Sequence, residues 1–423
     1  MPELRSAFGM VVLLGIAYLI SENRRKISWR LVLWALALQV LLALLVLKTS
    51  AAAAFFSWMN SFFVKFYDFV GEGARFVFGD LVKEVPFAFH VLPTVLLFAA
   101  LFKLLYHLGV IHPVVYGVGL VMNKTMKTSG AESLSAAANI FMGQTEAPLV
   151  VKPYIAKMTR SELMAIMVPG MASTAGGVMA AYIAMLSKHF PDIAGHLMAQ
   201  SIMSAPAGLL FAKMFVPETE TPATSGKIEL KRERECDGVF HALSVGTKEG
   251  VELVANIAAM LIVFIAIIAG LNFVWGAGCG FGTAHLGIDT SGVDTLQEIL
   301  GYLFAPFAWL MGVPTQDLLP AGMLIGEKTV LNEFIAYGHL GEYLGGKPIA
   351  EGIPWHALDQ RTVVILSYAL SGFSNFASIG ILVGGLGVMA PGRMGEIAKL
   401  GLKCLVAATF ACFMTASIAA ILL

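Results

Sequence analysis

The sequence is poor in charge. Lys, Arg, Asp and Glu make up only 13% of its 423 residues, and 28 basic residues balance 28 acidic ones. Soluble domains carry about 25% charged residues, and domains that bind nucleic acid gather basic residues on one face. Neither description fits this chain, in which 57% of the residues are hydrophobic and the mean hydropathy is +0.78. The composition predicts a polytopic membrane protein that does not bind nucleic acid.

Cysteine is scarce as well. Cys236, Cys279, Cys404 and Cys412 are scattered, with no C-x-x-C pair and no metal-binding spacing. This pattern speaks against redox chemistry, and we interpret the four as packing residues. No small-residue cleavage site follows the apolar residues 7–20, so we expect a first membrane helix there and not a signal peptide.

Apolar stretches mark the membrane spans, because a bilayer core about 30 Å thick requires about 20 residues of helix. We predict eight spans, near residues 4–21, 30–49, 88–111, 162–186, 194–216, 250–274, 362–387 and 398–422. Basic residues cluster in the loop after the first span, between Lys124 and Arg160, in residues 226–235, and at Arg393 with Lys399. Eight crossings place all of these on one side, which the positive-inside rule makes cytoplasmic. Both termini are then periplasmic.

Between the second and third spans, aromatic residues recur at helical spacing with polar residues opposite, a pattern typical of a helix in the membrane interface. The apolar face consists of Phe55, Phe56, Met59, Phe62, Phe63, Phe66 and Phe69, and the polar face of Ser57, Asn60, Lys65 and Asp68. A ninth, short span is the alternative, but it would place Lys65 and Asp68 at membrane depth.

Two stretches of the chain resemble each other. RSELMAIMVPGMASTAGGVMAAYIAML begins at Arg160 and RTVVILSYALSGFSNFASIGILVGGL at Arg361, and each has a break of small and polar residues near mid-span. Upstream of each lies a segment too polar to span the membrane, MGQTEAP with Glu146 and VLNEFIA with Glu333. The alternative is a chance likeness between two apolar stretches.

Aligned on these two glutamates, each half consists of one span, a short helix, a re-entrant hairpin and two more spans. Three crossings are an odd number, so the second half must start from the opposite side and the repeats are inverted. Inverted repeats are typical of secondary transporters, whose substrate site lies near the midplane between broken helices. The predicted fold is an all-α polytopic membrane protein with eight transmembrane helices, an interfacial helix and two re-entrant hairpins. Its predicted parts are an N-terminal scaffold (1–87), the first repeat (88–216), a cytoplasmic connector (217–249) and the second repeat (250–423).

Four polar breaks interrupt the apolar segments, at residues 139–148, 173–178, 329–334 and 372–378. Non-helical chain at membrane depth is tolerated only inside protein or against a watery cavity, and free carbonyls at a helix end attract cations. Carbonyls near Asn139, Met142 and Thr174, with the hydroxyls of Thr145 and Ser173, would form an all-oxygen shell for a small hard cation such as sodium. The alternative is that these polar groups only satisfy neighbouring backbone.

The two glutamates indicate the kind of substrate. A carboxylate in the bilayer interior costs a few kcal/mol and, when ionised, only accepts hydrogen bonds. A neutral substrate with several hydroxyls would satisfy Glu146 and Glu333. The alternative for Glu333 is a salt bridge, which Lys328 could provide.

Other polar and apolar residues flank the glutamates. Gln144, Asn332 and Asn375 can recognise further polar groups, while Phe373 and Val178 offer a flat apolar wall. Polar donors on one side and an aromatic face on the other suit a sugar joined to a planar heterocycle.

At these residues the chain closely resembles the concentrative nucleoside transporter family in its bacterial, eight-span, sodium-coupled form. The resemblance covers nearly the whole length, and GQTEAP, LNEF and SNFAS carry it together. It implies symport of nucleosides such as uridine with sodium, by an elevator-like motion, in a homotrimer of a bacterial inner membrane. It implies neither an enzyme nor an organic cofactor.

The resemblance also implies residue roles. Gln144, Thr145 and Glu146, beside Gly143 at the tip of the first hairpin, would contact the base, directly or through water. Glu333, beside Asn332 at the second tip, would bind ribose hydroxyls. The remaining implied substrate ligands are Asn375 and Ser378 on the ribose and Phe373 and Val178 on the base. The implied sodium ligands are the carbonyls of Asn139, Met142 and Thr174 with the side chains of Thr145 and Ser173.

Rival functions remain open at this stage. Members of the family that use protons tend to lack hydroxyl ligands, so Thr145 and Ser173 favour sodium. A sodium-coupled carrier of another small polar solute is possible, although a carboxylate substrate would meet two glutamates and no free arginine. An intramembrane enzyme is disfavoured because HExxH, GxSxG and GxGxxG after a strand are absent from the sequence. The four polar breaks speak against an inert scaffold.

Overall fold

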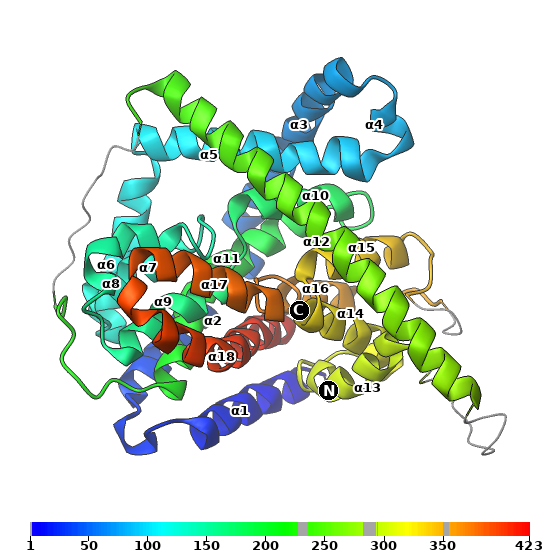
Figure 1. Cartoon of the computed structure of the whole chain (residues 1–423). Coiled ribbons are helices and arrows are strands. Elements are labelled where there is room, and N and C mark those ends of the chain that lie inside the picture. The colour runs from blue at the N-terminus through cyan, green and yellow to red at the C-terminus, as the bar shows by residue number, and fades with distance from the viewer. Residues whose placement is uncertain (1, 227–235, 282–292, 294, 350–354) are drawn as a thin grey trace.

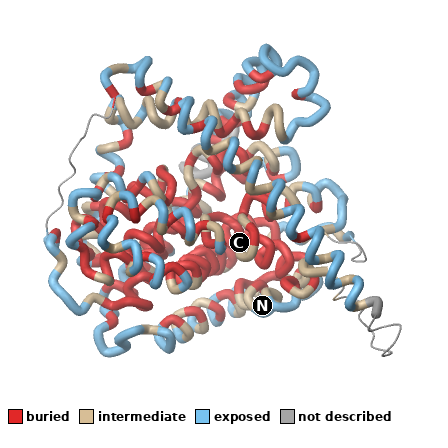
Figure 2. The backbone as a smooth tube through the Cα atoms, in the orientation of Figure 1, coloured by how far each residue is buried: buried red, intermediate tan, exposed pale blue. Residues whose placement is uncertain are grey.

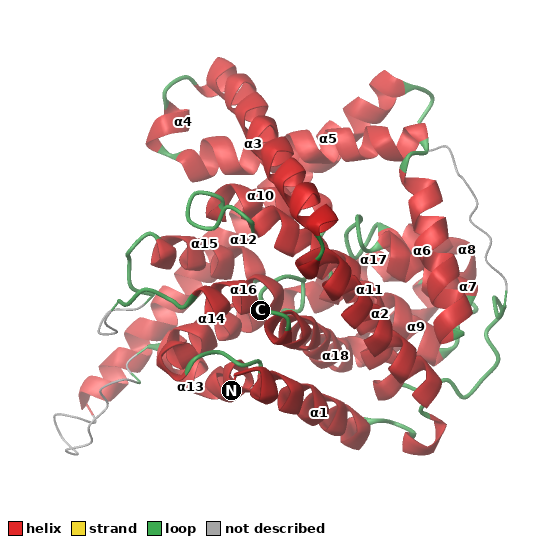
Figure 3. Ribbon diagram, turned by 180° about the vertical axis from the view of Figure 1, so that it is seen from behind, coloured by secondary structure: helices red, strands yellow, loops and turns green. Residues whose placement is uncertain are grey.

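The computed structural model describes residues 2–226, 236–281, 293, 295–349 and 355–423. Within these ranges the regular structure is helical, with no strand (Figures 1 and 3). Among the described residues, six helical segments are long and apolar enough to cross a bilayer: Pro2–Ile20, Trp29–Lys48, Phe87–Leu108, Arg160–Leu186, Val239–Cys279 and Pro391–Ile421. The predicted all-α membrane fold is therefore confirmed.

The other two predicted spans are helical but fall outside this set. Residues 194–216 form α11 (Ile193–Phe215), whose buried His196 and Gln200 lower its hydropathy. Residues 362–387 form two shorter helices, α16 (Gln360–Ala369) and α17 (Phe376–Met389). Both segments contain buried polar residues, which lower the hydropathy of the sequence and lie inside the protein.

The N-terminal part contains α1 (Pro2–Ile20), α2 (Trp29–Lys48), α3 (Ser50–Phe78) and the short α4 (Leu81–Glu84). Helix α3 contains the predicted interfacial helix and is longer than the aromatic pattern suggested. It is absent from the candidate spans. Met59, Phe63 and Phe66 are buried, whereas Phe62 and Phe69 are exposed, as expected of an amphipathic helix. Its position in the membrane interface stays a prediction.

The two repeats contain the same succession of elements. The first has α5 (Leu92–Leu108), α6 (Ile111–Met126), hairpin 1, the broken pair α9 (Arg160–Ala172) and α10 (Gly176–Leu186), and α11. The second has α12 (Val239–Phe281), α13 (Leu296–Leu310), hairpin 2, the broken pair α16 and α17, and α18 (Met394–Ile421).

Each hairpin consists of two short helical arms. Hairpin 1 comprises α7 (Gly130–Ala138), a 3-10 turn (Ala147–Val151) and α8 (Lys152–Ile155). Hairpin 2 comprises α14 (Leu318–Val330) and α15 (Glu333–Leu344).

One predicted boundary is wrong. Helix α12 begins at Val239, inside the range assigned to the connector, because the helix continues N-terminally beyond the apolar run that marks the span. Its 43 residues, at about 1.5 Å of rise each, exceed what a bilayer core requires. The basic segment 227–235 lies outside the described residues, and the division into four parts otherwise stays a prediction.

The ends of α1 reveal how the repeats are oriented. Near its N-terminus, Glu3 Oε1 lies 3.5 Å from Arg361 Nη1, and just after its C-terminus Glu22 Oε1 lies 2.9 Å from Arg160 Nη2. Arg160 and Arg361 begin the two similar stretches, and they lie at opposite ends of a helix long enough to span a membrane. The two repeats therefore enter the membrane from opposite sides, as the crossing count predicted.

Burial separates a core from a periphery. In the most apolar windows of Arg160–Leu186 and Pro391–Ile421, 89% of the residues are buried, against 6% in the window of Val239–Cys279. Figure 2 shows the buried residues concentrated in the middle, with the long α12 crossing the outside. The broken helices of both repeats thus lie in the protein interior, where their free backbone groups can find partners.

The loop after α1 and the starts of α9 and α18 meet on one face. Glu22 accepts hydrogen bonds from Arg160 and Lys403, and the Arg393 guanidinium bonds Glu396 at 2.6 Å. These contacts support the prediction that the basic loops share one side of the membrane. Its assignment to the cytoplasm stays a prediction.

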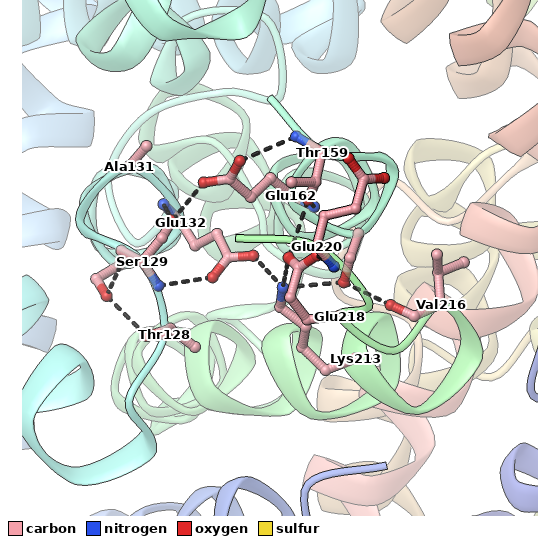
Figure 4. A network of polar contacts seen from close by, with 12 residues as sticks. Thr128, Ser129, Ala131, Glu132, Thr159, Glu162, Lys213, Val216, Glu218 and Glu220 are labelled. Carbon is pink, nitrogen blue, oxygen red and sulfur yellow. Dashed lines mark hydrogen bonds and ion pairs between the residues drawn. The ribbon is translucent and has the colours of Figure 1, made fainter. Parts of the chain in front are cut away.

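The base of hairpin 1 is tied to the core by a polar network (Figure 4). Ser129 caps α7 and Thr159 caps α9, and each forms a capping box with the glutamate three residues on. Lys213 of α11 forms ion pairs with Glu132 and, at 3.2 Å, with Glu218. The network anchors the hairpin at its base and leaves the tip to carry the site.

Candidate functional site

The site forms where the helices are interrupted. Non-helical residues 139–146 form the tip of hairpin 1, and residues 331–332 the tip of hairpin 2. Asparagines restart two helices: Asn332 Oδ1 accepts from Ile335 N at 2.9 Å, and Asn375 Oδ1 accepts from Ser378 N at 2.9 Å. Such N-caps satisfy amide groups that a helix start leaves free. The residue types that looked out of place in apolar segments are thus the ones that end and restart helices.

A single cavity of about 190 Å³ gathers every predicted substrate residue. Its walls include Gly143, Gln144, Thr145, Glu146, Val178, Asn332, Glu333, Phe373, Asn375 and Ser378. These residues come from both hairpin tips and both broken helices. The structure therefore brings together side chains that lie more than two hundred residues apart in the sequence.

Glu333 is held by two neutral donors. Tyr182 Oη donates to Oε1 at 3.0 Å, and Asn375 Nδ2 donates to Oε2 at 2.8 Å. Lys328 instead donates to Ser374 Oγ, and the described residues contain no salt bridge between Lys328 and a carboxylate. The geometry does not support the alternative that Glu333 serves in a salt bridge. Its remaining acceptor capacity is available to a ligand.

The carboxylate of hairpin 1 has a different environment. Glu146 is exposed, whereas Glu333 is 5% exposed. Glu146 Oε2 accepts a hydrogen bond from Gly143 N at 3.2 Å, which closes the tip on itself. The neighbouring Gln144 Oε1 is buried without a hydrogen-bond partner. The tip therefore presents an exposed carboxylate and an unsatisfied amide oxygen to the cavity.

The proposed sodium ligands lie where α7 and α9 both end. Asn139 is the C-cap of α7, and Ser173 is the C-cap of α9. The C-terminal ends of two helices therefore offer backbone carbonyls here. Gly176 N donates to Phe141 O at 3.2 Å, which ties the tip of hairpin 1 to the break in the broken helix. Ser173 Oγ and Asn139 Oδ1 are buried and have no hydrogen-bond partner.

This donor set fits a hard cation. Thr174 Oγ1 accepts from Gly372 N at 3.0 Å, and Asn139 Nδ2 donates to Ser135 O at 2.9 Å, so these groups do satisfy nearby backbone. Ser173 does not. In the described part of the chain, no cluster of three or more His, Cys, Asp or Glu residues can hold a metal. Carbonyls and hydroxyls are thus the relevant oxygens here.

Sequence reasoning missed part of the site. Leu253, Asn256, Ile257 and Met260 of α12 line the same cavity. Asn256 is the only polar side chain between residues 253 and 271, a signal that could have identified it. Nothing in the sequence marks Tyr182 as a site residue, because tyrosines are common in apolar helices.

Comparison with known proteins agrees with this architecture. Residues 8–81 match a family model described as "Na+ dependent nucleoside transporter N-terminus", residues 88–188 one described as "Nucleoside recognition", and residues 196–420 one described as "Na+ dependent nucleoside transporter C-terminus". The chain belongs to the Na+-dependent nucleoside transporter family. It is a membrane transporter and not an enzyme.

Relatives in the family cover the chain almost completely. An uncharacterized transporter of Haemophilus influenzae is 43% identical over 99% of this chain and 97% of its own length. The uncharacterized transporter YutK of Bacillus subtilis is 40% identical over 99% of both. The mouse solute carrier family 28 member 3 is 41% identical over 98% of this chain. The chain spans only 58% of that mouse protein.

Solved structures of a related transporter have the same fold. CNTnw in an inward-facing substrate-bound state superposes with a TM-score of 0.87 at 40% identity, covering 100% of this chain and 98% of that one. A doubly substituted CNTnw in an outward-facing state gives 0.89 at 41% identity, covering 100% and 99%. CNTnw has thus been observed in both inward-facing and outward-facing states.

Proposed function

We propose that this protein is a symporter that couples nucleoside uptake to sodium influx. The observation that carries the proposal is the single cavity lined by both hairpin tips and both broken helices. A site built from two inverted repeats can open to either side when the repeats move relative to their surroundings.

A nucleoside suits the two sides of the cavity. Glu333, fixed by Tyr182 and Asn375, would accept hydrogen bonds from ribose hydroxyls, with Ser378 beside it. Gln144, Thr145 and Glu146 would meet the polar edge of the base. Val178 and Phe373, which also line the cavity, would cover the face of the base. Uridine is the natural first probe because it is a small nucleoside with both features.

Sodium would bind behind the substrate. Its proposed ligands are the carbonyls of Asn139, Met142 and Thr174 with the hydroxyls of Thr145 and Ser173. Thr145 also lines the substrate cavity, so a sodium ion that fixes this residue prepares the tip of hairpin 1 for the nucleoside. By linkage, nucleoside must then raise the affinity for sodium by the same factor.

The wider assignments follow from the proposed function. We propose an elevator-like motion in which the hairpins and broken helices carry the site past α12, a homotrimer, and a bacterial inner membrane with periplasmic termini. The exposed face of α12 and the burial of α9, α10 and α18 support a division between an outer helix and an inner moving body.

Thermal stabilisation of the purified protein tests the proposal most directly. We expect uridine to raise the melting temperature in sodium and to do so much less in choline. In proteoliposomes, uridine uptake should collapse when the sodium gradient is removed. Uptake that follows a proton gradient instead would establish the proton-coupled alternative. Stabilisation by another polar solute, and by no nucleoside, would establish a carrier of a different substrate.

A further inference from the structure

Lys328 is a buried basic residue whose hydrogen-bond partner is neutral. It lies in the last turn of α14 and is 0% exposed, yet the ion pairs of the described residues do not include it. Its ammonium donates to Ser374 Oγ in the break between α16 and α17. An ammonium removed from water is costly unless nearby groups compensate for it. A charged lysine is therefore expected here only where its surroundings favour a cation.

The internal repeat locates this charge. When Arg160 is set against Arg361, Ser173 corresponds to Ser374. Ser173 is the proposed sodium ligand whose hydroxyl has no hydrogen-bond partner, whereas the hydroxyl of Ser374 is occupied by Lys328.

The hairpin alignment places Lys328 close to the same site. When Glu146 is set against Glu333, the residue opposite Lys328 is Phe141, next to the proposed sodium ligand Met142. Lys328 thus comes from the part of hairpin 2 that corresponds to the sodium-binding part of hairpin 1. The proposed sodium site of the first repeat lies between a hairpin and a broken helix, and Lys328 likewise lies between hairpin 2 and the break that contains Ser374.

The two hairpins differ in how many backbone carbonyls they leave free for an ion. In hairpin 1 the helix stops at Ala138, and residues 139–146 are non-helical, so the carbonyls of Asn139 and Met142 are not used within a helix and can coordinate an ion. In hairpin 2 the helix continues to Val330, so most of its carbonyls are used within the helix. Hairpin 2 cannot offer an unwound carbonyl shell, but the C-terminal end of α14 favours a cation. A lysine side chain meets that requirement.

We propose that the ammonium of Lys328 is a tethered cation, which takes in the second repeat the place that sodium takes in the first. This inference rests on the proposed sodium site. Lys328 and Glu333 lie on either side of the tip of hairpin 2, so the lysine moves with the substrate-binding carboxylate and its positive charge offsets the charge of that carboxylate. The second repeat then needs no ion of its own, and one sodium site suffices for coupling.

The sodium dependence of uridine-induced stabilisation tests this role. In wild type we expect a Hill coefficient for sodium of about one. Lys328→Ala removes the tethered charge and leaves space, so we expect weaker uridine binding that high sodium restores, with a Hill coefficient that rises towards about two. Lys328→Arg should stay close to wild type. A Lys328→Ala variant with the sodium dependence and uridine affinity of wild type would overturn the inference.

Further variants separate charge from structure. Lys328→Met fills the space without a charge. We expect this variant to fold but to bind uridine poorly, and we expect that added sodium does not restore the binding. Wild-type uridine affinity in Lys328→Met contradicts the inference, even if Lys328→Ala does not fold. Ser374→Ala keeps the lysine and should retain a Hill coefficient of about one. If it instead reproduces the change seen in Lys328→Ala, the effect belongs to the helix break and not to the charge.

The controls distinguish this inference from the proposed function. Lys248 lies on the exposed part of α12, with a side chain 79% exposed, and Lys248→Ala should leave all the measurements unchanged. A wild type that neither uridine nor sodium stabilises contradicts the proposed function and, with it, the tethered cation. A wild type that responds to both while Lys328→Ala responds identically contradicts the tethered cation alone.

Discussion

Tyr182 and Glu333 belong to different repeats, and the phenol of the first donates a 3.0 Å hydrogen bond to the carboxylate of the second. Tyr182 lies in α10 and Glu333 begins α15. This bond joins the two halves of the protein at the substrate cavity, and Asn375 completes the pair of donors. These two donors therefore fix the orientation of the carboxylate.

Glu333→Gln should nearly abolish nucleoside binding. An amide supplies one acceptor oxygen where the carboxylate supplies two, and its NH2 group would face one of the two donors, Tyr182 or Asn375. We expect the uridine-induced rise in melting temperature to disappear while the protein remains folded. Glu342→Gln, on the exposed end of the same helix, is the matched control. Wild-type affinity in Glu333→Gln would refute the ribose assignment.

Tyr182→Phe should weaken nucleoside binding without abolishing it. A neutral donor to a charged acceptor contributes about 1.5–3 kcal/mol, so an affinity loss of roughly tenfold or more is expected if the bond orients the carboxylate for substrate. Tyr337→Phe is the control: its ring stacks on Tyr182 at 4.3 Å, but its hydroxyl donates to Ser367 O. That variant should lower stability and leave uridine affinity closer to wild type. Equal affinities in the two variants would show that the Tyr182 hydroxyl does not position Glu333.

Ser173→Ala should raise the sodium concentration that half-maximal uptake requires. Ser173 Oγ is buried and without a hydrogen-bond partner, so removing it leaves no protein group unsatisfied and should not destabilise the fold. Loss of one oxygen ligand would weaken sodium binding and, through linkage, uridine binding at low sodium. At saturating sodium the uridine affinity should recover. An unchanged sodium dependence would remove Ser173 from the site.

Acid should loosen the contact between the α1 loop and the starts of α9 and α18. Hydrogen bonds from Arg160, and then from Lys403, lower the pKa of Glu22 from its ordinary value of 4.5 to about 2. The folded state thus binds this proton more weakly than the unfolded state does. The stabilisation is complete above about pH 4.5 and is lost as the pH falls towards 2.

The melting temperature in detergent at several pH values checks this. Wild type should melt above Glu22→Gln at pH 6, and the gap should narrow as the pH approaches 3. Salt should narrow the gap as well, because the group is partly exposed. A gap that does not depend on pH would mean that Glu22 stabilises the loop by packing and not by charge.

The parts of this protein that sequence predicts well are those governed by local rules. Apolar length determines a span, and polar residues inside an apolar run mark a break, which is why Glu146, Glu333 and Asn375 could be placed in one site. The start of α12 was missed because its first turns are exposed helix outside the apolar run. A hydropathy pattern does not distinguish such a helix from a loop.

Tertiary partners are what the sequence did not predict. The sequence leaves open a salt bridge between Lys328 and Glu333, but Lys328 bonds Ser374. The direction of a side chain in the last turn of α14 depends on how hairpin 2 packs against the broken helix. No local pattern points to Tyr182, since its partner Glu333 lies in the other repeat. Inverted repeats place residues in contact that no local spacing relates.

Gly385 provides a test of the contact between α17 and the tip of hairpin 1. A Cβ at this glycine would lie 2.6 Å from Thr145 Cγ2, so Gly385→Ala must displace the threonine that we assign to both substrate and sodium. Both affinities should fall together, measured as uridine-induced stabilisation across a sodium series. A methyl group added at the neighbouring Gly384 would have nothing within 4 Å, and Gly384→Ala should preserve binding and stabilise the helix by up to about 1 kcal/mol. If Gly385→Ala shifts uridine affinity and leaves sodium affinity untouched, Thr145 does not serve both ligands.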